Sequence, residues 1–149
     1  PIGIASADLQ GRLLDANPAF AGLLGYTREE LVGKCVADIT EPQDREETQR
    51  HFEALVRGDI PKYELDKRYV RKDGNVIHVK PKEFDLLAFL AHNRGIVLSR
   101  DTILERVWGW DYDGGSRTVD VHIRALRKKI EQNVVETVIG VGYRFRGFQ

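Results

Sequence analysis

The segment that most constrains this chain is a basic, amphipathic stretch near its carboxyl end, residues 116–131. Its apolar residues recur at intervals of four, three and four positions, which places them along one side of an α-helix: Val119, Ile123, Leu126 and Ile130. The contrasting side holds Thr118, Val121, His122, Ala125 and Lys129, with Arg117, Arg124 and Lys128 at its margins. We therefore predict a helix that follows a Ser116 cap, runs to about Glu131 and buries only one of its sides.

Charge is distributed unevenly along the chain. The 149 residues carry 23 basic and 23 acidic side chains, so the formal net charge is zero. Residues 1–79 hold 11 basic and 14 acidic residues, a net of −3, whereas residues 80–149 hold 12 and 9, a net of +3. Residues 117–146 alone hold 7 basic and 3 acidic residues, a net of +4. Such a stretch is the electrostatic footprint of a nucleic-acid-binding element, and a merely solvated helix face is the alternative.

Composition and motifs argue against several classes of protein. The single cysteine excludes an intrachain disulfide and a multi-cysteine zinc site. No stretch approaches the ~18 apolar residues of a membrane span, so we expect no membrane contact and a cytoplasmic location. Metal-ligand spacings and phosphate-binding glycine loops are missing from the sequence, and no pair of residues suggests a catalytic dyad. We expect neither an enzyme nor a metal site.

The N-terminal half is predicted to alternate short strands and short helices. The expected elements are a hairpin around residues 10–11, a helix from 17–18, a capping box at 27–30, a helix over 42–56, and strands at 63–70 and 75–79. Two runs carry a family resemblance, DLQGRLLDANPAFAGLLGYTREELVGK at 8–34 and YELDKRYVRKDGNVIHV at 63–79. In this order they resemble the PAS domain, a sensory and dimerisation module.

The PAS resemblance implies a sheet packed against short helices, which in some members hold haem, flavin or a small ligand. The family's next long strand is missing here, so we expect a truncated sheet with exposed strand edges that favour a homodimer. No cofactor is assigned, and a PAS ligand stays open. Six residues either line a pocket or fill the core: Phe20, Leu24, Tyr26, Leu31, Phe52 and Leu55.

The C-terminal half is predicted to hold three helices followed by a hairpin. A helix starts at Pro81 and ends near 93–95, a second follows a Ser99 cap, and a loop rich in glycine, aspartate and aromatic residues covers 108–115. The helix of residues 116–131 comes next. Strands at 136–139 and 142–145 then flank a glycine-rich tip. This order is the winged-helix plan.

Three runs closely resemble the OmpR/PhoB-type effector domain of bacterial response regulators. They are PKEFDLLAFLAHNRGIVLSRDTILERVWG, SRTVDVHIRALRKKI and ETVIGVGYRF, and together they cover about 70 residues. The resemblance implies that the third helix enters the major groove of double-stranded DNA, that the wing reaches the minor groove, and that loop 109–115 touches RNA polymerase.

Side-chain chemistry divides the expected DNA contacts into two groups. Long or polar side chains can read base edges, and small apolar ones can meet thymine methyl groups; we assign Arg117, Thr118, Val121, His122, Arg124 and Ala125 to this group. The other basic residues are expected at phosphates, which position the protein without reading sequence: Arg127, Lys128, Lys129, Arg144 and Arg146. About five phosphate contacts would give a slope of about −4 to −5 for log affinity against log salt. Ile139 and Ala125 stand where the family often carries arginine, so we expect weak binding.

The junction is the least usual feature. Residues 63–79 match both the last PAS hairpin and the hairpin that precedes the effector helices. We therefore expect an α+β chain in which a truncated PAS-like half, residues 1–79, joins a winged helix-turn-helix half, residues 80–149, through a shared hairpin. An engineered chimera, a natural fusion and a chain with omitted loops all stay open.

The leading hypothesis is a DNA-binding transcription-regulator module with a PAS-like sensory or dimerising half. The first alternative is a small-ligand sensor that does not bind DNA. The second is a designed fold chimera without selected activity.

Overall fold

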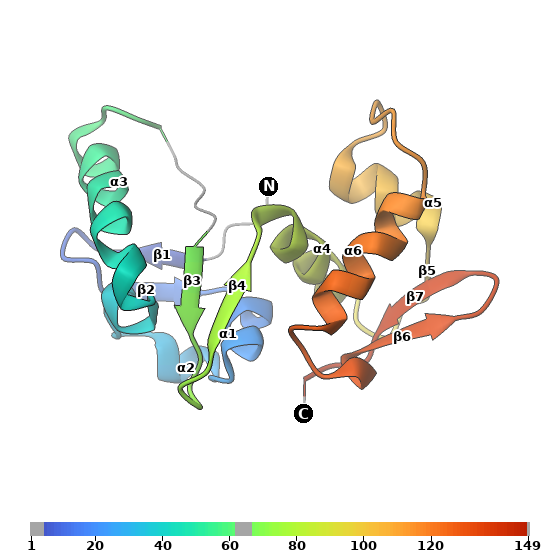
Figure 1. The fold of residues 1–149 in the computed structure, drawn as a ribbon, viewed down its shortest axis with the longest axis horizontal. Coiled ribbons are helices and arrows are strands. Elements are labelled where there is room, and N and C mark those ends of the chain that lie inside the picture. Colours follow the sequence, from blue (N-terminus) through green and yellow to red (C-terminus); the bar gives the residue numbers. More distant parts are fainter. Residues whose placement is uncertain (1–4, 62–66, 149) are drawn as a thin grey trace. The chain divides into compact units, whose positions relative to one another are not determined.

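The computed structural model describes residues 5–61 and 67–148, and Figure 1 traces them from blue to red. The chain divides into two compact units, one that ends at Pro81 and one that begins at Lys82. The hairpin that the sequence analysis assigned to both halves falls in the first of these units. Within the described residues, no helix is long and apolar enough to cross a membrane.

The N-terminal unit starts with a hairpin and two capped helices. Strands β1 (Ala5–Ala7) and β2 (Leu13–Ala16) pair antiparallel. Helix α1 (Pro18–Leu24) begins where the side chain of Asn17 accepts a hydrogen bond from the backbone N–H of Ala19. Helix α2 (Arg28–Leu31) begins at the predicted capping box, in which the Thr27 hydroxyl accepts from the Glu30 N–H at 3.1 Å. Both sequence predictions are confirmed, because the capping signals are local.

The second part of this unit differs in two ways from its prediction. A 3-10 segment that was not predicted, η1 (Val36–Ile39), comes first, and the helix expected from residue 42 starts as a second 3-10 segment, η2 (Pro42–Asp44), before it becomes α3 (Arg45–Arg57). Strands β3 (Lys67–Val70) and β4 (Val76–Val79) form a hairpin of their own, so the described residues contain two separate two-stranded sheets. Residues 62–66, which the prediction placed at the start of the third strand, lie outside the described residues.

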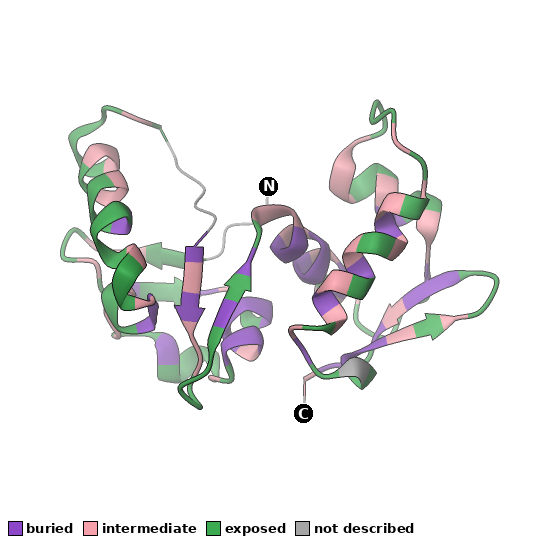
Figure 2. Ribbon diagram, in the orientation of Figure 1, coloured by how far each residue is buried: buried purple, intermediate pink, exposed green. Residues whose placement is uncertain are grey.

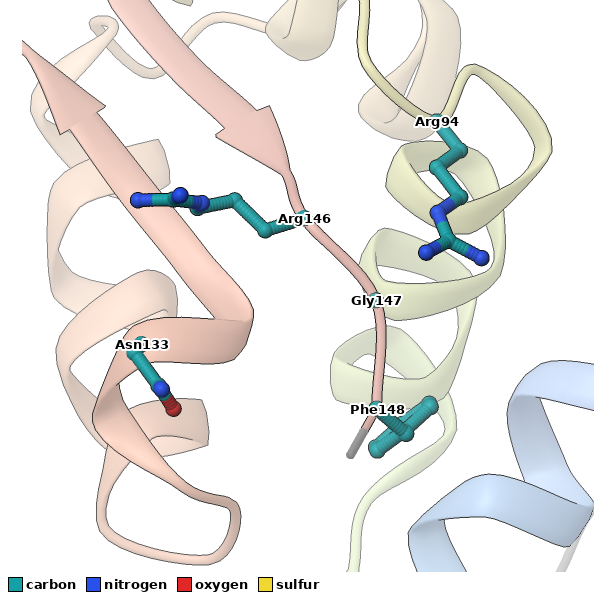
Figure 3. Close-up of a pocket in the computed structure, with 5 residues that line it drawn as sticks. All are labelled: Arg94, Asn133, Arg146, Gly147 and Phe148. Atoms are coloured by element: carbon teal, nitrogen blue, oxygen red, sulfur yellow. The ribbon is translucent and has the colours of Figure 1, made fainter.

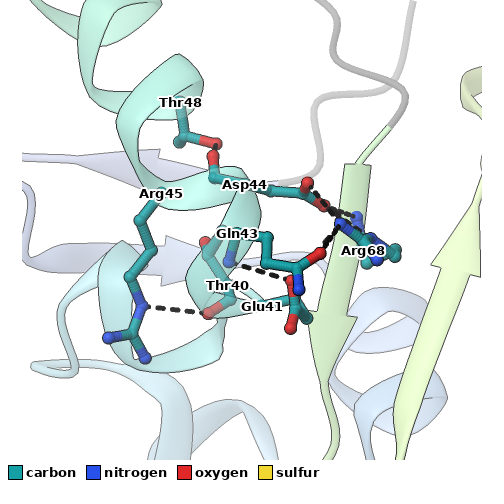
Figure 4. A network of polar contacts seen from close by, with 7 residues as sticks. All are labelled: Thr40, Glu41, Gln43, Asp44, Arg45, Thr48 and Arg68. Atoms are coloured by element: carbon teal, nitrogen blue, oxygen red, sulfur yellow. Dashed lines mark hydrogen bonds and ion pairs between the residues drawn. The ribbon is translucent and has the colours of Figure 1, made fainter.

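A polar network fixes the start of α3 against β3 (Figure 4). The guanidinium of Arg68 donates to both carboxylate oxygens of Asp44, at 3.1 and 2.9 Å, and the backbone N–H of Arg68 donates to the same carboxylate at 2.8 Å. The Nη2 nitrogen of this guanidinium also donates to the side-chain oxygen of Gln43 at 3.2 Å and lies 3.4 Å from a carboxylate oxygen of Glu41. The hydrogen bonds from Arg68 lower the pKa of Asp44 to about 2, so the carboxylate stays ionised through the neutral range.

Lys67 is buried, and among the described residues of this unit it is the most deeply placed cation. Its ammonium group donates to the Thr40 hydroxyl at 3.2 Å and lies 4.9 Å from the centre of the Tyr69 ring. Burial disfavours the charged form and lowers the pKa of Lys67 to about 8. The Tyr69 ring also packs edge-on against Phe20, with 5.2 Å between the ring centres, and this pair joins the hairpin to α1.

The C-terminal unit has the predicted order of elements. Helix α4 (Pro81–His92) leads through β5 (Leu98–Ser99) to α5 (Arg100–Ile103), which continues as a π-helical segment, η3 (Leu104–Trp108). Helix α6 (Arg117–Arg127) follows, and a 3-10 turn, η4 (Gln132–Val134), leads to the strands β6 (Val135–Val138) and β7 (Gly142–Phe145). The sheet has the order β5-β7-β6 and is antiparallel.

Helix α6 differs from its prediction at both ends. It ends at Arg127, about one turn before the expected Glu131. Ser116 occupies the cap position, but its side chain makes no capping hydrogen bond and its backbone is already helical. The Ser99 cap of α5 is confirmed, because the Ser99 hydroxyl accepts from the N–H of Thr102 at 3.1 Å.

Candidate nucleic-acid interface

Helix α6 is held in the unit by its apolar side. Val119, Ile123 and Leu126 are at most 1% exposed, and Ile130 beyond the helix end is also buried. Burial of each side chain of this size stabilises the folded state by roughly 1.5–3 kcal/mol. The packing of these apolar residues therefore determines which residues of α6 face water. Figure 2 shows the buried residues of α6 in purple and its exposed residues in green.

The exposed side of α6 is turned relative to the prediction. Its exposed residues are Arg117, Val121, Arg124 and Lys128. Thr118, His122, Ala125 and Lys129, which the sequence analysis placed at the centre of this side, are only half-exposed. Arg117, Arg124 and Lys128, which were predicted at the margins of the exposed side, therefore lie at its centre. The helix packs along Val119, Ile123 and Leu126, and the side opposite to these residues contains Arg124 and Lys128.

A carboxylate near the start of α6 ties the helix to two other elements. Asp120 accepts a hydrogen bond from the Arg100 guanidinium at 2.7 Å and from the Tyr143 hydroxyl at 2.5 Å. Arg100 begins α5 and Tyr143 lies in β7, and the Arg100 guanidinium also sits 5.2 Å from the centre of the Tyr143 ring. These contacts join α6 to α5 and to β7 and so hold its orientation within the unit. Sequence reasoning missed this triad because its members lie 20 and 23 positions apart and follow no periodic pattern.

The same triad explains two pKa changes. Burial opposes ionisation of Asp120, but the hydrogen bonds from Tyr143 and Arg100 outweigh it, and its pKa lies below the ordinary value. Burial and the hydrogen bond to Asp120 raise the pKa of the Tyr143 hydroxyl. At neutral pH the triad therefore holds an ionised carboxylate between a cation and a phenol donor.

His122 packs inside the unit as well as along the helix. Its imidazole lies edge-on to Trp108, with ring centres 4.9 Å apart, and its Nδ1 is 2.8 Å from the Thr118 carbonyl oxygen. Lys82 lies 5.9 Å from the centre of the Trp108 ring. Trp108 thus connects the start of α4 to the middle of α6, while the edge of His122 stays partly open to water.

Three of the five predicted phosphate contacts are held by partners within the unit. Lys129 pairs with the buried Glu83 at 2.6 Å. The guanidinium of Arg127 donates to the carbonyl of Val135 and to the hydroxyl of Thr137, at 2.7 and 2.8 Å. Arg144 donates three hydrogen bonds to Glu136, at 3.1, 2.8 and 2.9 Å.

The remaining cations are more open. Arg146 is exposed and lies 3.8 Å from Glu136. Arg124 and Lys128 are exposed, and among the described residues neither has a carboxylate within ion-pair distance. The exposed basic side chains of α6, Arg117, Arg124 and Lys128, form a positively charged surface that suits a polyanion.

Comparison with known families decides what this arrangement is. Residues 74–145 match the family model described as "Transcriptional regulatory protein, C terminal". Residues 13–82 match the model described as "PAS fold". The chain joins a PAS domain to an OmpR/PhoB-type DNA-binding domain. The two matches overlap at residues 74–82, the second strand of the hairpin and the start of α4.

Relatives of the OmpR/PhoB-type domain are regulators. The chain is 35% identical over 127 residues to the sensory transduction protein RegX3 of Mycolicibacterium smegmatis, a match that covers 82% of this chain and 55% of RegX3. It is 48% identical over 73 residues to the transcriptional regulatory protein CssR of Bacillus subtilis, which covers 49% of this chain and 32% of CssR. The chain thus spans about half of RegX3 and a third of CssR.

A solved structure is also similar. The crystal structure of the DNA-binding domain of Bacillus subtilis CssR has 44% sequence identity and a TM-score of 0.48, and the match covers 53% of this chain and 90% of that one. In the OmpR/PhoB-type domain of the present chain, α6 is the third helix and the β6–β7 hairpin is the wing.

The loop before α6 presents aromatic surface. Trp110 is 85% exposed and Tyr112 is 41% exposed. The Tyr112 ring lies against Gly114, where an added Cβ would come within 2.2 Å of the ring, so the glycine is required for this loop shape. The exposed Trp110 and Tyr112 side chains therefore belong to the loop that leads directly into α6.

The six residues proposed for the PAS pocket fall into two groups. Phe20, Leu24 and Leu31 are at most 2% exposed and belong to the core. Tyr26, Phe52 and Leu55 are half-buried, and the Tyr26 ring lies 5.4 Å from the Lys34 ammonium and 6.0 Å from that of Lys72. The first group fills the interior, so only the second group has side-chain surface left that a ligand could contact.

A hollow in the OmpR/PhoB-type domain is lined by Arg94, Asn133, Arg146, Gly147 and Phe148 (Figure 3). The Arg94 guanidinium covers Gly147, where an added Cβ would lie 2.6 Å from it, whereas Arg146 points away from Arg94. The two cations therefore do not converge on one ligand position. Over residues 5–61 and 67–148, no group of three histidine, cysteine, aspartate or glutamate side chains could hold a metal ion.

Proposed function

We propose that this chain is a transcription-regulator module that binds double-stranded DNA through α6. The observation that carries the proposal is the exposed line of Arg117, Val121, Arg124 and Lys128, opposite an apolar side that is fully packed. An α-helix fits the major groove, and arginine can bond two acceptors of one guanine there. A regulator of this class acts on the chromosome, so we place the protein in the cytoplasm and give it no catalytic role.

Within this proposal, base reading is assigned to α6. Arg124 and Val121 stand at the centre of its exposed side, whereas Arg117, expected from the sequence to read a base, stands at the helix start and is assigned to a phosphate instead. Thr118, His122 and Ala125 contribute from the flank that stays half-exposed. Arg124 suits a guanine and Val121 suits a thymine methyl group.

Phosphate contacts are assigned to fewer residues than the sequence suggested. We assign them to Lys128 and Arg146, with Arg117 at the helix start. Arg127, Lys129 and Arg144 instead support the positions of the wing and of α4, because they donate to Thr137, Glu83 and Glu136, respectively.

Two further partners are proposed. The exposed Trp110 and Tyr112 side chains support a contact of loop 109–115 with RNA polymerase, beside DNA-bound α6. Among the described residues, β1 and β4 pair with a strand on one edge only, whereas β2 and β3 also bond to residues 33–36 and 40–41. The open edges of β1 and β4 support a sensory or dimerising role for residues 1–79, upstream of a DNA-binding half at residues 80–149.

Salt dependence tests the proposed function. A labelled 30-bp duplex, enriched from a random pool by the wild-type chain, is titrated by fluorescence anisotropy at several salt concentrations. With about three phosphate contacts, log affinity should fall with log salt at a slope of about −3. Arg124→Ala should weaken binding about tenfold and relax base preference at one position.

Arg94→Ala is the matched control, because Arg94 is an exposed arginine at the far end of β7 from the wing tip, and it should bind like wild type. A wild-type chain that enriches no duplex at low salt contradicts the proposed function. A slope of −4 to −5 would show that Arg127, Lys129 and Arg144 leave their partners for phosphates.

A further inference from the structure

Two contacts within the OmpR/PhoB-type domain restrict the imidazole of His122. Its Nδ1 lies 2.8 Å from the backbone carbonyl oxygen of Thr118, one turn earlier in α6. Its ring stands edge-on to Trp108 of η3, with 4.9 Å between the ring centres and 75° between the ring planes. A hydrogen bond at one ring nitrogen and a packed aromatic neighbour together hold the ring in one orientation.

The bond to Thr118 decides which nitrogen of His122 carries the proton. A carbonyl oxygen can only accept a hydrogen bond, so Nδ1 is the donor. A neutral imidazole has a single N–H, and its other nitrogen is an acceptor. Nε2, the ring nitrogen farther from the helix backbone, therefore presents a lone pair and no hydrogen.

This lone pair is available to a bound molecule. His122 is half-exposed, and its Nε2 is not among the buried polar atoms that lack a partner, so the atom reaches water. Within residues 5–61 and 67–148, no protein group donates a hydrogen bond to it. The protein thus leaves one oriented acceptor on the half-exposed flank of α6.

The neighbours of His122 on the helix place this acceptor beside the proposed base contacts. Successive residues of an α-helix are turned by about 100°, so His122 stands directly to one side of Val121. Val121 and Arg124 form the centre of the exposed side. When these two residues face base edges in the major groove, Nε2 faces the edge of an adjoining base pair.

We propose that His122 is a specificity-determining residue that accepts a hydrogen bond from the N4 amino group of a cytosine. This inference rests on the proposed DNA binding of α6. The exocyclic amino groups of cytosine and adenine are the hydrogen-bond donors of the major groove, whereas guanine and thymine present acceptors there. Adenine also places its acceptor N7 beside the amino group, opposite the Nε2 lone pair, and cytosine presents the amino group alone. The chain therefore prefers cytosine at one fixed position in the α6 site.

The test starts from duplexes that the full wild-type chain selects from a random 30-bp pool at about pH 8, the upper limit of the range over which histidine changes its charge. Wild type should enrich cytosine at one position. Thymine at that position exchanges the donor for an acceptor and should weaken binding about fivefold, the loss expected for one hydrogen bond. 5-Methylcytosine should bind like cytosine, because it keeps the amino group and adds only the methyl group that thymine carries.

Two variants and a control assign this preference to one side chain. His122→Ala should bind the cytosine and thymine duplexes with equal affinity and an unchanged salt slope, because a neutral imidazole at a base neutralises no phosphate. His122→Arg, whose side chain only donates, should prefer guanine at the same position. His92→Ala is the control, since His92 is an exposed histidine at the end of α4, and it should keep the wild-type preference.

The outcomes separate the inference from the function on which it rests. If wild type selects an α6 site but binds 5-methylcytosine as weakly as thymine, the site excludes a methyl group and the inference is overturned. If His122→Ala weakens binding to both duplexes equally, the imidazole lies at a phosphate and the inference is also overturned, while DNA binding stands in both cases. If wild type enriches no duplex, the proposed function fails and the inference fails with it.

Discussion

Gly142→Ala is expected to destabilise the OmpR/PhoB-type domain by about 3 kcal/mol. A Cβ at this position would lie 1.9 Å from the backbone carbonyl oxygen of Leu98, which is far inside van der Waals contact. The obstacle is backbone, so no side-chain rotation relieves it, and β5 must separate from β7. Because Ser99 of β5 caps α5, the damage extends to the helices around α6.

Thermal unfolding followed by tryptophan fluorescence measures this effect in the right unit, since both tryptophans, Trp108 and Trp110, lie in it. Gly115→Ala is the control, because Gly115 has open space at its Cβ position and no positive φ, and it should change stability by less than about 0.5 kcal/mol. Equal melting temperatures for the two variants would show that β5 and β7 are not as close as described.

The second large effect is expected for Asp120→Ala. The change removes the acceptor shared by Arg100 and Tyr143 and should cost about 2 kcal/mol, a figure reduced for the partial exposure of the Asp120 and Arg100 side chains. Because the triad holds the orientation of α6, DNA affinity should fall together with stability. Urea unfolding monitored by tryptophan fluorescence measures the stability, and fluorescence anisotropy measures the DNA affinity.

The stability that Asp120 contributes depends on pH with a defined sign. The folded-state pKa of Asp120 lies below its ordinary value, so its contribution is complete above that ordinary value and is lost as the pH falls through the folded-state pKa. The difference in the free energy of unfolding between wild type and Asp120→Ala should therefore be constant near neutral pH and should decrease in acid. A difference that increases in acid would contradict this assignment. Ser116→Ala is the control at the start of the same helix, since the Ser116 side chain makes no capping bond.

Local patterns were the most predictable part of the structure. The apolar spacing of Val119, Ile123 and Leu126 located the buried side of α6, and the sequence around Thr27 located the start of α2. Both patterns involve residues that lie within about two helical turns of one another. The orientation of the exposed side was less predictable, because it depends on how α6 packs on the rest of the unit, and the resulting centre at Arg124 and Lys128 had been assigned to the margin.

Contacts between distant residues could not be predicted. The bonds of Asp120 with Arg100 and Tyr143, and of Lys129 with Glu83, join segments 20 to 46 positions apart. Each depends on the packing of whole elements, so a cation counted from sequence as free for phosphate can prove to be engaged. The splitting of the PAS domain strands into two separate sheets has the same origin, since strand pairing is a long-range choice.

The central claim is that the exposed side of α6 lies in the major groove. Methylation protection tests it most directly, because dimethyl sulfate attacks guanine N7, which faces that groove. On the duplex enriched by wild type, we predict protection of guanines over one short major-groove segment, with the guanine opposite Arg124 exposed again in Arg124→Ala. Tight binding that leaves every guanine N7 in the site reactive would contradict the account.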